Sequence, residues 1–329
     1  MVQLAGKEIG TTGYGLMGLT WRADPPPQEQ SFRAMRASLA NGANFWNGGE
    51  LYGTAERNSL HLLNEYFTKY PEDVSKVVIS IKGGLIPNSH GIDGGRDNVR
   101  RSIDECLKHL TPVGKKLDLF ECARVDPNTP IETSIAAIDE YVKEGKLGGI
   151  SLSEVSANSI RRAAKVAKIS AVEVEVSLFS TEIFENGIAQ ACAELDIPVI
   201  AYSPLGRGFL TGQIKKREDI PDRIQIFPRF SAEHFDQNIV LVQKVEDLAA
   251  KKGCTVGQIA IAWLKSLSGK NGLPVIIPIP GATTEERIQE NMADVQLSDA
   301  DMKAIQEFLA GFTAKGDRYG GPLAALMNG

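Results

Sequence analysis

The sequence predicts an α/β fold, a closed (β/α)8 TIM barrel in which outer helices surround eight parallel strands. Short apolar, β-branched runs alternate with amphipathic helix patterns along the chain, which is typical of a parallel sheet. The runs number eight, and most are apolar throughout, as strands covered on both faces are. A length of 329 residues is ordinary for one such barrel, and no composition shift marks a boundary. We therefore expect one domain over residues 1–329, with an open doubly wound sheet as the alternative.

Each expected strand is a short run rich in Val, Ile, Leu or aromatic residues. In chain order the runs lie at 12–19, 44–48, 77–82, 117–122, 148–152, 171–176, 197–202 and 275–279. Apolar residues at helical spacing separate them. In the first such helix Phe32, Met35 and Leu39 form the apolar stripe, and Gly42 ends it.

Capping residues mark the starts of three later helices. Thr129 is the expected N-cap of the first of these, with Pro130 at the first helical position and Glu132 completing a capping box. Thr255 and Ser298 are the expected N-caps of the other two. These signals place helices between the strands, as the barrel requires.

Two segments are unusually long for loops. Residues 205–238 follow the seventh expected strand, and residues 311–329 form a glycine-rich tail. The loops after the strands of such a barrel build its active site. We therefore expect 205–238 to act as a lid or cofactor clamp, and the tail, through Asp317, Arg318 and Tyr319, to close over the substrate or to contact a neighbour.

Charge and hydropathy argue against several classes of function. The chain has 36 Lys and Arg against 41 Asp and Glu, a formal charge of −5, so we expect no nucleic-acid or membrane partner. No run approaches the roughly 18 apolar residues that a membrane span needs. The first residues lack the basic region and apolar run of a signal peptide, so none is expected.

The cysteines and histidines give no metal or disulfide pattern. The four cysteines are widely spaced without a C-x-x-C, as reduced thiols of an intracellular protein are. None of the four histidines lies at metal-ligand spacing, so no metal is expected. There is no G-x-G-x-x-G after the first strand and no phosphate-loop lysine. We expect the protein in the cytoplasm, with the nucleus as an additional location.

The chemistry is expected at Tyr52 and Lys82. Both lie where an expected strand ends, in WNGGELYG at 46–53 and VVISIKGG at 77–84. A lysine beside a tyrosine would lower the phenol pKa from about 10 towards neutrality and make it a usable general acid. Taken alone, each residue has an ordinary structural explanation, because a rim tyrosine usually packs and a strand-end lysine usually extends to solvent.

Seven segments, in order over the whole chain, resemble the aldo-keto reductase family. They are NGGELYG at 47–53, IKGG at 81–84, DLFECAR at 118–124, GISLSE at 149–154, VEVEVSLFS at 172–180, AYSPLGRGFLTG at 201–212 and IPIPGATTEERIQEN at 277–291. Within that family, GYGLMGLTWR at 13–22, ECARVD at 121–126 and Asn47 are similar to the yeast pyridoxal reductases.

The resemblance implies an enzyme that uses NADPH to reduce an aldehyde, pyridoxal to pyridoxine above all. Tyr52 would donate the proton and Lys82 would tune it. Asn47 stands at the family's aspartate position and brings no charge, so Lys82 should depress the pKa of Tyr52 more strongly than usual. Ala123 stands at the family's histidine position and leaves space for an aromatic aldehyde. Trp21, Trp46 and Arg124 would complete the substrate pocket.

The resemblance also assigns a cofactor site. Tyr202 would stack on the nicotinamide, Ser153 and Glu154 would meet the carboxamide, and Glu173 replaces the family's usual glutamine there. Arg287 would contact the 2′-phosphate. The remaining expected contacts are the first loop at Gly15, Leu16 and Met17, the pyrophosphate loop at Ser203, Leu205, Gly206, Gly208 and Leu210, and the adenosine end at Gly281, Thr283, Thr284, Glu290 and Asn291. Gly281 replaces a lysine that many members use.

Three other functions fit the same residues. One is a generalist reductase of aromatic or aliphatic aldehydes. Another is a cofactor-binding regulatory subunit, by analogy with the potassium-channel β subunits of this fold. The last is a barrel enzyme that uses Lys82 as a Schiff-base amine.

Overall fold

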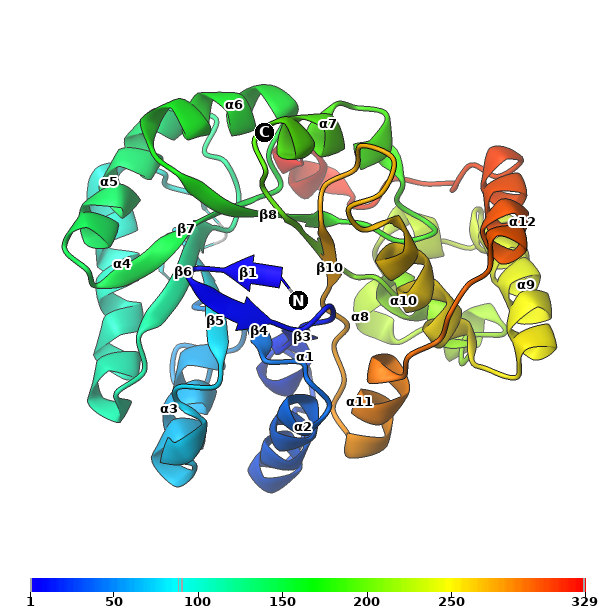
Figure 1. Cartoon of the computed structure of the whole chain (residues 1–329), viewed down its shortest axis with the longest axis horizontal. Coiled ribbons are helices and arrows are strands. Elements are labelled where there is room, and N and C mark those ends of the chain that lie inside the picture. The colour runs from blue at the N-terminus through cyan, green and yellow to red at the C-terminus, as the bar shows by residue number, and fades with distance from the viewer. Residues whose placement is uncertain (1, 88, 90, 328) are drawn as a thin grey trace.

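The computed structural model describes residues 2–87, 89, 91–327 and 329, and its central feature is a barrel of eight parallel strands (Figure 1). The strands are β3 Tyr14–Gly15, β4 Phe45–Gly49, β5 Val78–Gly83, β6 Leu117–Cys122, β7 Leu147–Ser153, β8 Ile169–Glu175, β9 Val199–Tyr202 and β10 Ile276–Pro278. They pair in chain order. The backbone N–H of Gly13 donates to the carbonyl of Pro278 at 2.9 Å, and Gly15 bridges to Gly281, so β3 closes on β10. The (β/α)8 TIM barrel is confirmed.

The helices surround this ring, and the longer ones pack against its outer face or against neighbouring helices (Figure 1). They are α1 Met17–Thr20, α2 Gln28–Ala40, α3 Ser59–Lys69, α4 Arg96–Leu110, α5 Ile131–Lys143, α6 Ala157–Val166, α7 Ile188–Glu194, α8 Asp222–Gln225, α9 Phe235–Lys252, α10 Val256–Leu267, α11 Glu285–Met292 and α12 Asp299–Ala310. The expected N-caps Thr255 and Ser298 are confirmed, each within a capping box. No helix in the described ranges is long and apolar enough to cross a membrane.

Alternation along each strand decides which side chains reach the barrel interior. In β4, Phe45 joins the interior cluster, Trp46 packs on the outer face, and Asn47 points inward again. In β8 the same alternation places Ala171 in the interior cluster, with Glu173 and Glu175 on the same side of the strand. Polar residues at interior positions near the strand ends therefore line the carboxyl end of the barrel.

An N-terminal hairpin covers the opposite end, and the sequence did not predict it. Strands β1 Val2–Leu4 and β2 Lys7–Ile9 pair antiparallel, and Figure 1 shows β1 across the centre of the ring. Leu4 and Ile9 pack against the interior cluster. Strands of three residues are too short to show a hydrophobic period.

Two expected elements differ in the structure. The expected strand at 12–19 is a strand only over β3, and the short helix α1 follows it. The apolar residues of this run, Leu16 at the N-cap of α1 and Leu19 within it, are three residues apart, so both are buried on one face of the helical turn. Thr129 does not cap α5, because its hydroxyl donates to the Asp126 carboxylate at 2.7 Å. Pro130 is the N-cap itself, and Glu132 pairs with a neighbouring helix instead of completing a capping box.

The two long segments are folded over the carboxyl end. Within 205–238 the chain forms short helical turns at Gly206–Thr211, Arg217–Asp219 and Pro228–Phe230 before α9 begins. The tail returns to the barrel, where the N–H of Gly329 donates to the carbonyl of Glu154 at 3.1 Å. The tail is thereby fixed beside the strand ends where the site lies.

Candidate active site

Tyr52, Lys82 and Asn47 meet inside the carboxyl end of the barrel. Lys82 lies in β5, Asn47 in β4, and Tyr52 three residues beyond β4. Their exposed fractions are only 9 % for Tyr52, 4 % for Lys82 and 3 % for Asn47. The Lys82 ammonium lies 6.0 Å from the centre of the Tyr52 ring. A Cβ at Gly49 would lie 3.0 Å from atoms of that ring, so glycine lets the ring lie against the strand without a shift.

The Lys82 ammonium is held by two buried carboxylates. Glu121 of β6 lies 3.2 Å from it, and Glu173 of β8 forms a second ion pair. The amide oxygen of Asn47 accepts from Lys82 at 3.2 Å, and its nitrogen donates to Glu173 at 2.6 Å. The Ser151 hydroxyl donates to Glu121 at 2.7 Å. The charge absent at Asn47 is thus supplied from β6 and β8.

These carboxylates overturn the expected effect of Lys82 on Tyr52. Burial raises the pKa of Tyr52 to about 12, and the lowering by Lys82 is opposed by Glu173 and Glu121. The prediction of a strongly depressed tyrosine pKa is therefore wrong, because burial of the phenol dominates and because the one ammonium faces two carboxylates. Burial also raises the pKa of Glu173 well above its usual range, since Lys82 balances only one of the pair.

The pKa of Lys82 lies above its usual value. Burial lowers it, but Glu121 and Glu173 outweigh that effect. Lys82 is therefore charged and Tyr52 protonated at neutral pH. A protonated phenol beside a fixed cation can donate a proton to an oxygen that gains negative charge.

Glu173 and Glu154 already have partners within the protein, so neither carboxylate is free to bind the carboxamide of a cofactor. Glu173 belongs to the Lys82 cluster, which corrects its assignment to the cofactor. Glu154 accepts hydrogen bonds from the Glu175 N–H at 3.2 Å, the Tyr202 hydroxyl at 2.7 Å and Arg318 at 3.1 Å. Ser153 differs, because its buried hydroxyl has no hydrogen-bond partner among the residues described.

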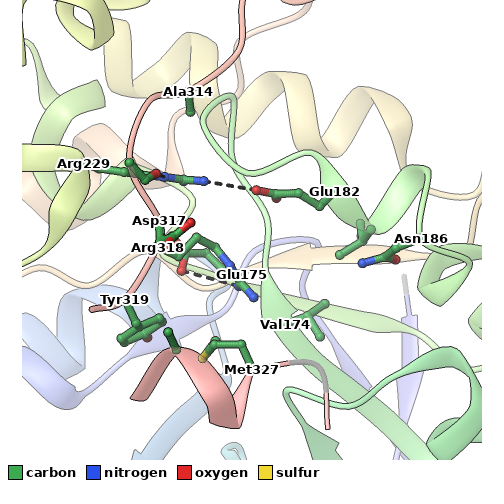
Figure 2. A pocket seen from close by; sticks show the side chains of 13 residues that line it. Val174, Glu175, Glu182, Asn186, Arg229, Ala314, Asp317, Arg318, Tyr319 and Met327 are labelled. Carbon is green, nitrogen blue, oxygen red and sulfur yellow. Dashed lines mark hydrogen bonds and ion pairs between the residues drawn. The ribbon is translucent and has the colours of Figure 1, made fainter. Parts of the chain in front are cut away.

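The tail adds an arginine cluster that the sequence did not predict in detail. Arg318 binds Glu154 through both guanidinium nitrogens and lies 3.6 Å from Glu175. Arg207 pairs with Glu175 at 2.7 Å. Figure 2 shows Arg318 and Glu175 of this cluster beside a cavity that residues of β8 and of the tail help to line. The cavity volume is about 410 Å³. The tail therefore lies over the strand ends beside Tyr202.

The pyrophosphate loop has the expected glycine geometry but not the expected free amides. Gly206 and Gly208 have φ of +56° and +111°, which favours glycine. The N–H groups of Gly206, Gly208 and Leu210 donate to carbonyls of Ser203 and Leu205 at 2.9 to 3.1 Å. As these amides already have partners inside the loop, the prediction that they point at a pyrophosphate is corrected.

The expected adenosine end lies at the start of α11. Thr284 caps this helix, and Arg287 pairs with Glu290 at 2.5 Å while remaining partly exposed. Asn291 is buried. Thr283 lies just before the helix, and Gly281 instead helps to close the barrel through Gly15.

Of the residues expected in the first loop and in the substrate pocket, some lie at the active site and others lie in the hydrophobic core. Trp21 stacks on Tyr52 at 5.4 Å and is 46 % exposed, as a pocket wall would be. Trp46 is fully buried on the outer face, and its indole donates to Ser38 at 2.9 Å, so its assignment to the pocket is wrong. The side chain of Leu16 is likewise buried in the core, whereas Met17 is exposed.

Sequence reasoning missed Glu121, for which a signal existed. Glu121 has the same parity in its strand as the interior residue Leu119, so it points into the barrel. A glutamate in such a run requires a cation partner. No group of three or more potential metal ligands occurs in the described part of the chain.

The aldo/keto reductase family model matches residues 11–310. A probable pyridoxal reductase of Schizosaccharomyces pombe is 40% identical over 98% of both chains. A putative pyridoxal reductase of Saccharomyces cerevisiae is 40% identical over 94% of this chain and 95% of its own. The S. pombe aldo-keto reductase yakc, whose name specifies NADP(+), is 34% identical over 94% and 92%. The expected similarity to yeast pyridoxal reductases is confirmed.

Solved structures share the fold. The glycerol dehydrogenase of Gluconobacter oxydans superimposes with a TM-score of 0.81 over 97% of this chain and 98% of its own, at 20% identity. A thermostable aldo-keto reductase gives a TM-score of 0.69 over 93% and 98%, at 21% identity. At such identities the likeness concerns the barrel alone.

Proposed function

The chain belongs to the aldo/keto reductase family, and on that premise we propose that it reduces the aldehyde of pyridoxal to the alcohol, giving pyridoxine, with NADPH as reductant. The observation that carries this proposal is the buried, protonated Tyr52 beside the charged Lys82. The names of two relatives at 40% identity support pyridoxal, and the name of a third supports NADP.

The chain offers several groups that fit a bound NADPH. The partnerless hydroxyl of Ser153 suits the carboxamide. The Tyr202 ring has no stacking partner among the described aromatic side chains, which leaves a face for the nicotinamide. Arg287 and Asn291 suit the adenosine end. When bound, the cofactor would supply the hydride.

Tyr52 would act as the proton donor. With a pKa near 12 it keeps its proton until the substrate oxygen becomes a strong base, as an alkoxide is. Lys82 would stabilise the tyrosinate left behind. Glu121, Glu173 and Asn47 would hold Lys82 in place. Glu154 would position Tyr202 through its hydroxyl rather than contact the carboxamide.

A turnover assay tests this function. The protein is mixed with NADPH, and the loss of NADPH absorbance is followed with pyridoxal and with a panel of simple aldehydes. We expect the highest kcat/KM on pyridoxal. Equal rates across the panel would indicate a generalist reductase. Cofactor binding without turnover would indicate a regulatory subunit, and borohydride trapping of substrate on Lys82 would indicate Schiff-base chemistry.

Ala123→His should lower kcat/KM on pyridoxal, by about 10-fold. The imidazole would occupy the space that the methyl group leaves beside Arg124. We expect a small aldehyde such as propanal to be reduced at least as well as by the parent enzyme. Ala123→Ser is the matched control and should change both rates little. A gain on pyridoxal in the histidine variant would contradict this account of the pocket.

A further inference from the structure

Arg124 is a guanidinium without an acidic partner at the carboxyl end of the barrel. It follows β6 by two residues and adjoins Ala123. Its Nε is buried and has no hydrogen-bond partner among the residues described, and its NH1 donates only to the neighbouring carbonyl of Ala123, at 2.5 Å. Within the described ranges no carboxylate lies at ion-pair distance from it. A buried donor in this state costs free energy that a bound acceptor would recover.

The nearby carboxylates already have cationic partners. Arg207 pairs with Glu175 at 2.7 Å, and Arg318 binds Glu154 at 3.1 Å. The carboxylates of Glu175 and Glu154 are thus bound by Arg207 and Arg318, and neither pairs with Arg124. The Arg124 guanidinium is therefore left without an anionic partner in the described part of the chain.

Arg124 also lies beside the strand end that carries Lys82, because the N–H of the adjacent Ala123 donates to the carbonyl of Gly83 at 2.9 Å. Its guanidinium is 5.7 Å from the centre of the Tyr319 ring, and the Tyr319 hydroxyl is 3.2 Å from that of Tyr202. Burial dominates the pKa of Tyr52, followed by the Lys82 cluster, and Arg124 is the next charge that acts on it. A substrate whose aldehyde contacts Tyr52 would therefore have its adjoining substituents near Arg124.

We infer that Arg124 is a specificity residue that binds an anionic oxygen on the ring atom next to the aldehyde-bearing carbon. This inference rests on the proposed function, because pyridoxal carries a hydroxyl at that position. The ring nitrogen withdraws electrons, so this hydroxyl is ionised at neutral pH. A guanidinium on the phenolate would hold the aldehyde oxygen at Tyr52, and the methyl side chain of Ala123 leaves room for the ring.

The test compares Arg124→Gln with the parent enzyme, both with NADPH, on pyridoxal, 2-formylbenzoate, 4-formylbenzoate, methyl 2-formylbenzoate and benzaldehyde. A charge-assisted hydrogen bond of this kind corresponds to about 10- to 100-fold. We expect that loss in kcat/KM on pyridoxal and 2-formylbenzoate, mainly as a higher KM. The methyl ester, the 4-isomer and benzaldehyde should change less than about 3-fold. Arg124→Lys should retain part of the preference.

Arg161→Gln is the matched control, because it removes the same charge from a surface pair with Glu194. This variant should leave kcat/KM on all five aldehydes unchanged. Equal losses on charged and uncharged aldehydes with Arg124→Gln would assign the residue a structural role and overturn the inference, whereas pyridoxal reduction would stand. An equal loss on the 4-isomer would overturn the assignment to the adjacent position. Absence of pyridoxal turnover, with the Arg124 effect kept on 2-formylbenzoate, would refute only the proposed function.

Discussion

Tyr52→Phe should lower kcat for pyridoxal by at least about 10²-fold and up to about 10⁴-fold, the range for loss of a general acid. The substitution removes one oxygen and leaves the ring, which keeps its stacking on Trp21 and its contact with Gly49. The substrate oxygen would then develop negative charge without a proton donor. Steady-state kinetics with NADPH measure the effect, and cofactor fluorescence titration measures binding.

The Tyr52→Phe variant should bind NADPH as tightly as the parent enzyme, because the groups proposed for the cofactor are untouched. Tyr319→Phe removes a phenol beside the Tyr202 hydroxyl and is the comparison for a tyrosine that is not the proton donor. We expect it to retain most of kcat. Should Tyr52→Phe keep more than about a tenth of kcat, Tyr52 would not be the proton donor.

The arrangement of the barrel could be predicted because buried parallel strands appear in the sequence as short, continuous apolar runs. The expected strand at 117–122 coincides with β6, Leu117–Cys122. The hairpin Val2–Leu4 and Lys7–Ile9 could not be predicted, because its strands are short and owe their place to packing under the barrel. Thr129 failed as a cap because α5 begins one residue later than expected, with Pro130 as its N-cap, and the Thr129 hydroxyl instead donates to the nearby Asp126 carboxylate.

The pair at the centre of the site could be predicted, but its electrostatics could not. Tyr52 and Lys82 lie at strand ends, which the chain order reveals. The partners of Lys82 come from three strands that meet only when the barrel closes. In the sequence, Asn47 at the family's aspartate position therefore suggested that Lys82 had lost its negatively charged partner. Strand parity shows that Glu121 and Glu173 point inward, yet only the structure shows that both reach one ammonium.

The arginine cluster was beyond prediction for a related reason. Arg318 is separated from Glu154 by 164 residues, and nothing in the local pattern joins the two. The tail nevertheless explains why a buried carboxylate is tolerated at Glu154, because Arg318 and Tyr202 donate hydrogen bonds to it. A buried carboxylate at this position requires such partners.

Lys82→Met should both abolish turnover and destabilise the fold by about 3–5 kcal/mol, the cost of leaving a buried ion pair without one partner. Glu121 and Glu173 would remain buried with no cation between them. In Lys82→Met/Glu121→Gln/Glu173→Gln the carboxylates are replaced by amides of similar shape. We expect the triple variant to recover most of the unfolding free energy, measured in urea, while turnover stays absent.

The loss of stability in Lys82→Met should depend on pH in a defined direction. Burial already holds the pKa of Glu173 above its usual range while Lys82 is present, and removal of the ammonium raises it further. The folded variant then binds a proton at Glu173 that the unfolded chain releases above the ordinary glutamate pKa of about 4.3, so its stability rises relative to the parent enzyme as the pH falls towards that value. The triple variant lacks these groups and should not show this change. If Lys82→Met were as stable as the parent enzyme at neutral pH, or if its stability deficit grew on acidification, the carboxylates would not depend on Lys82, and the cluster would need another source of charge balance.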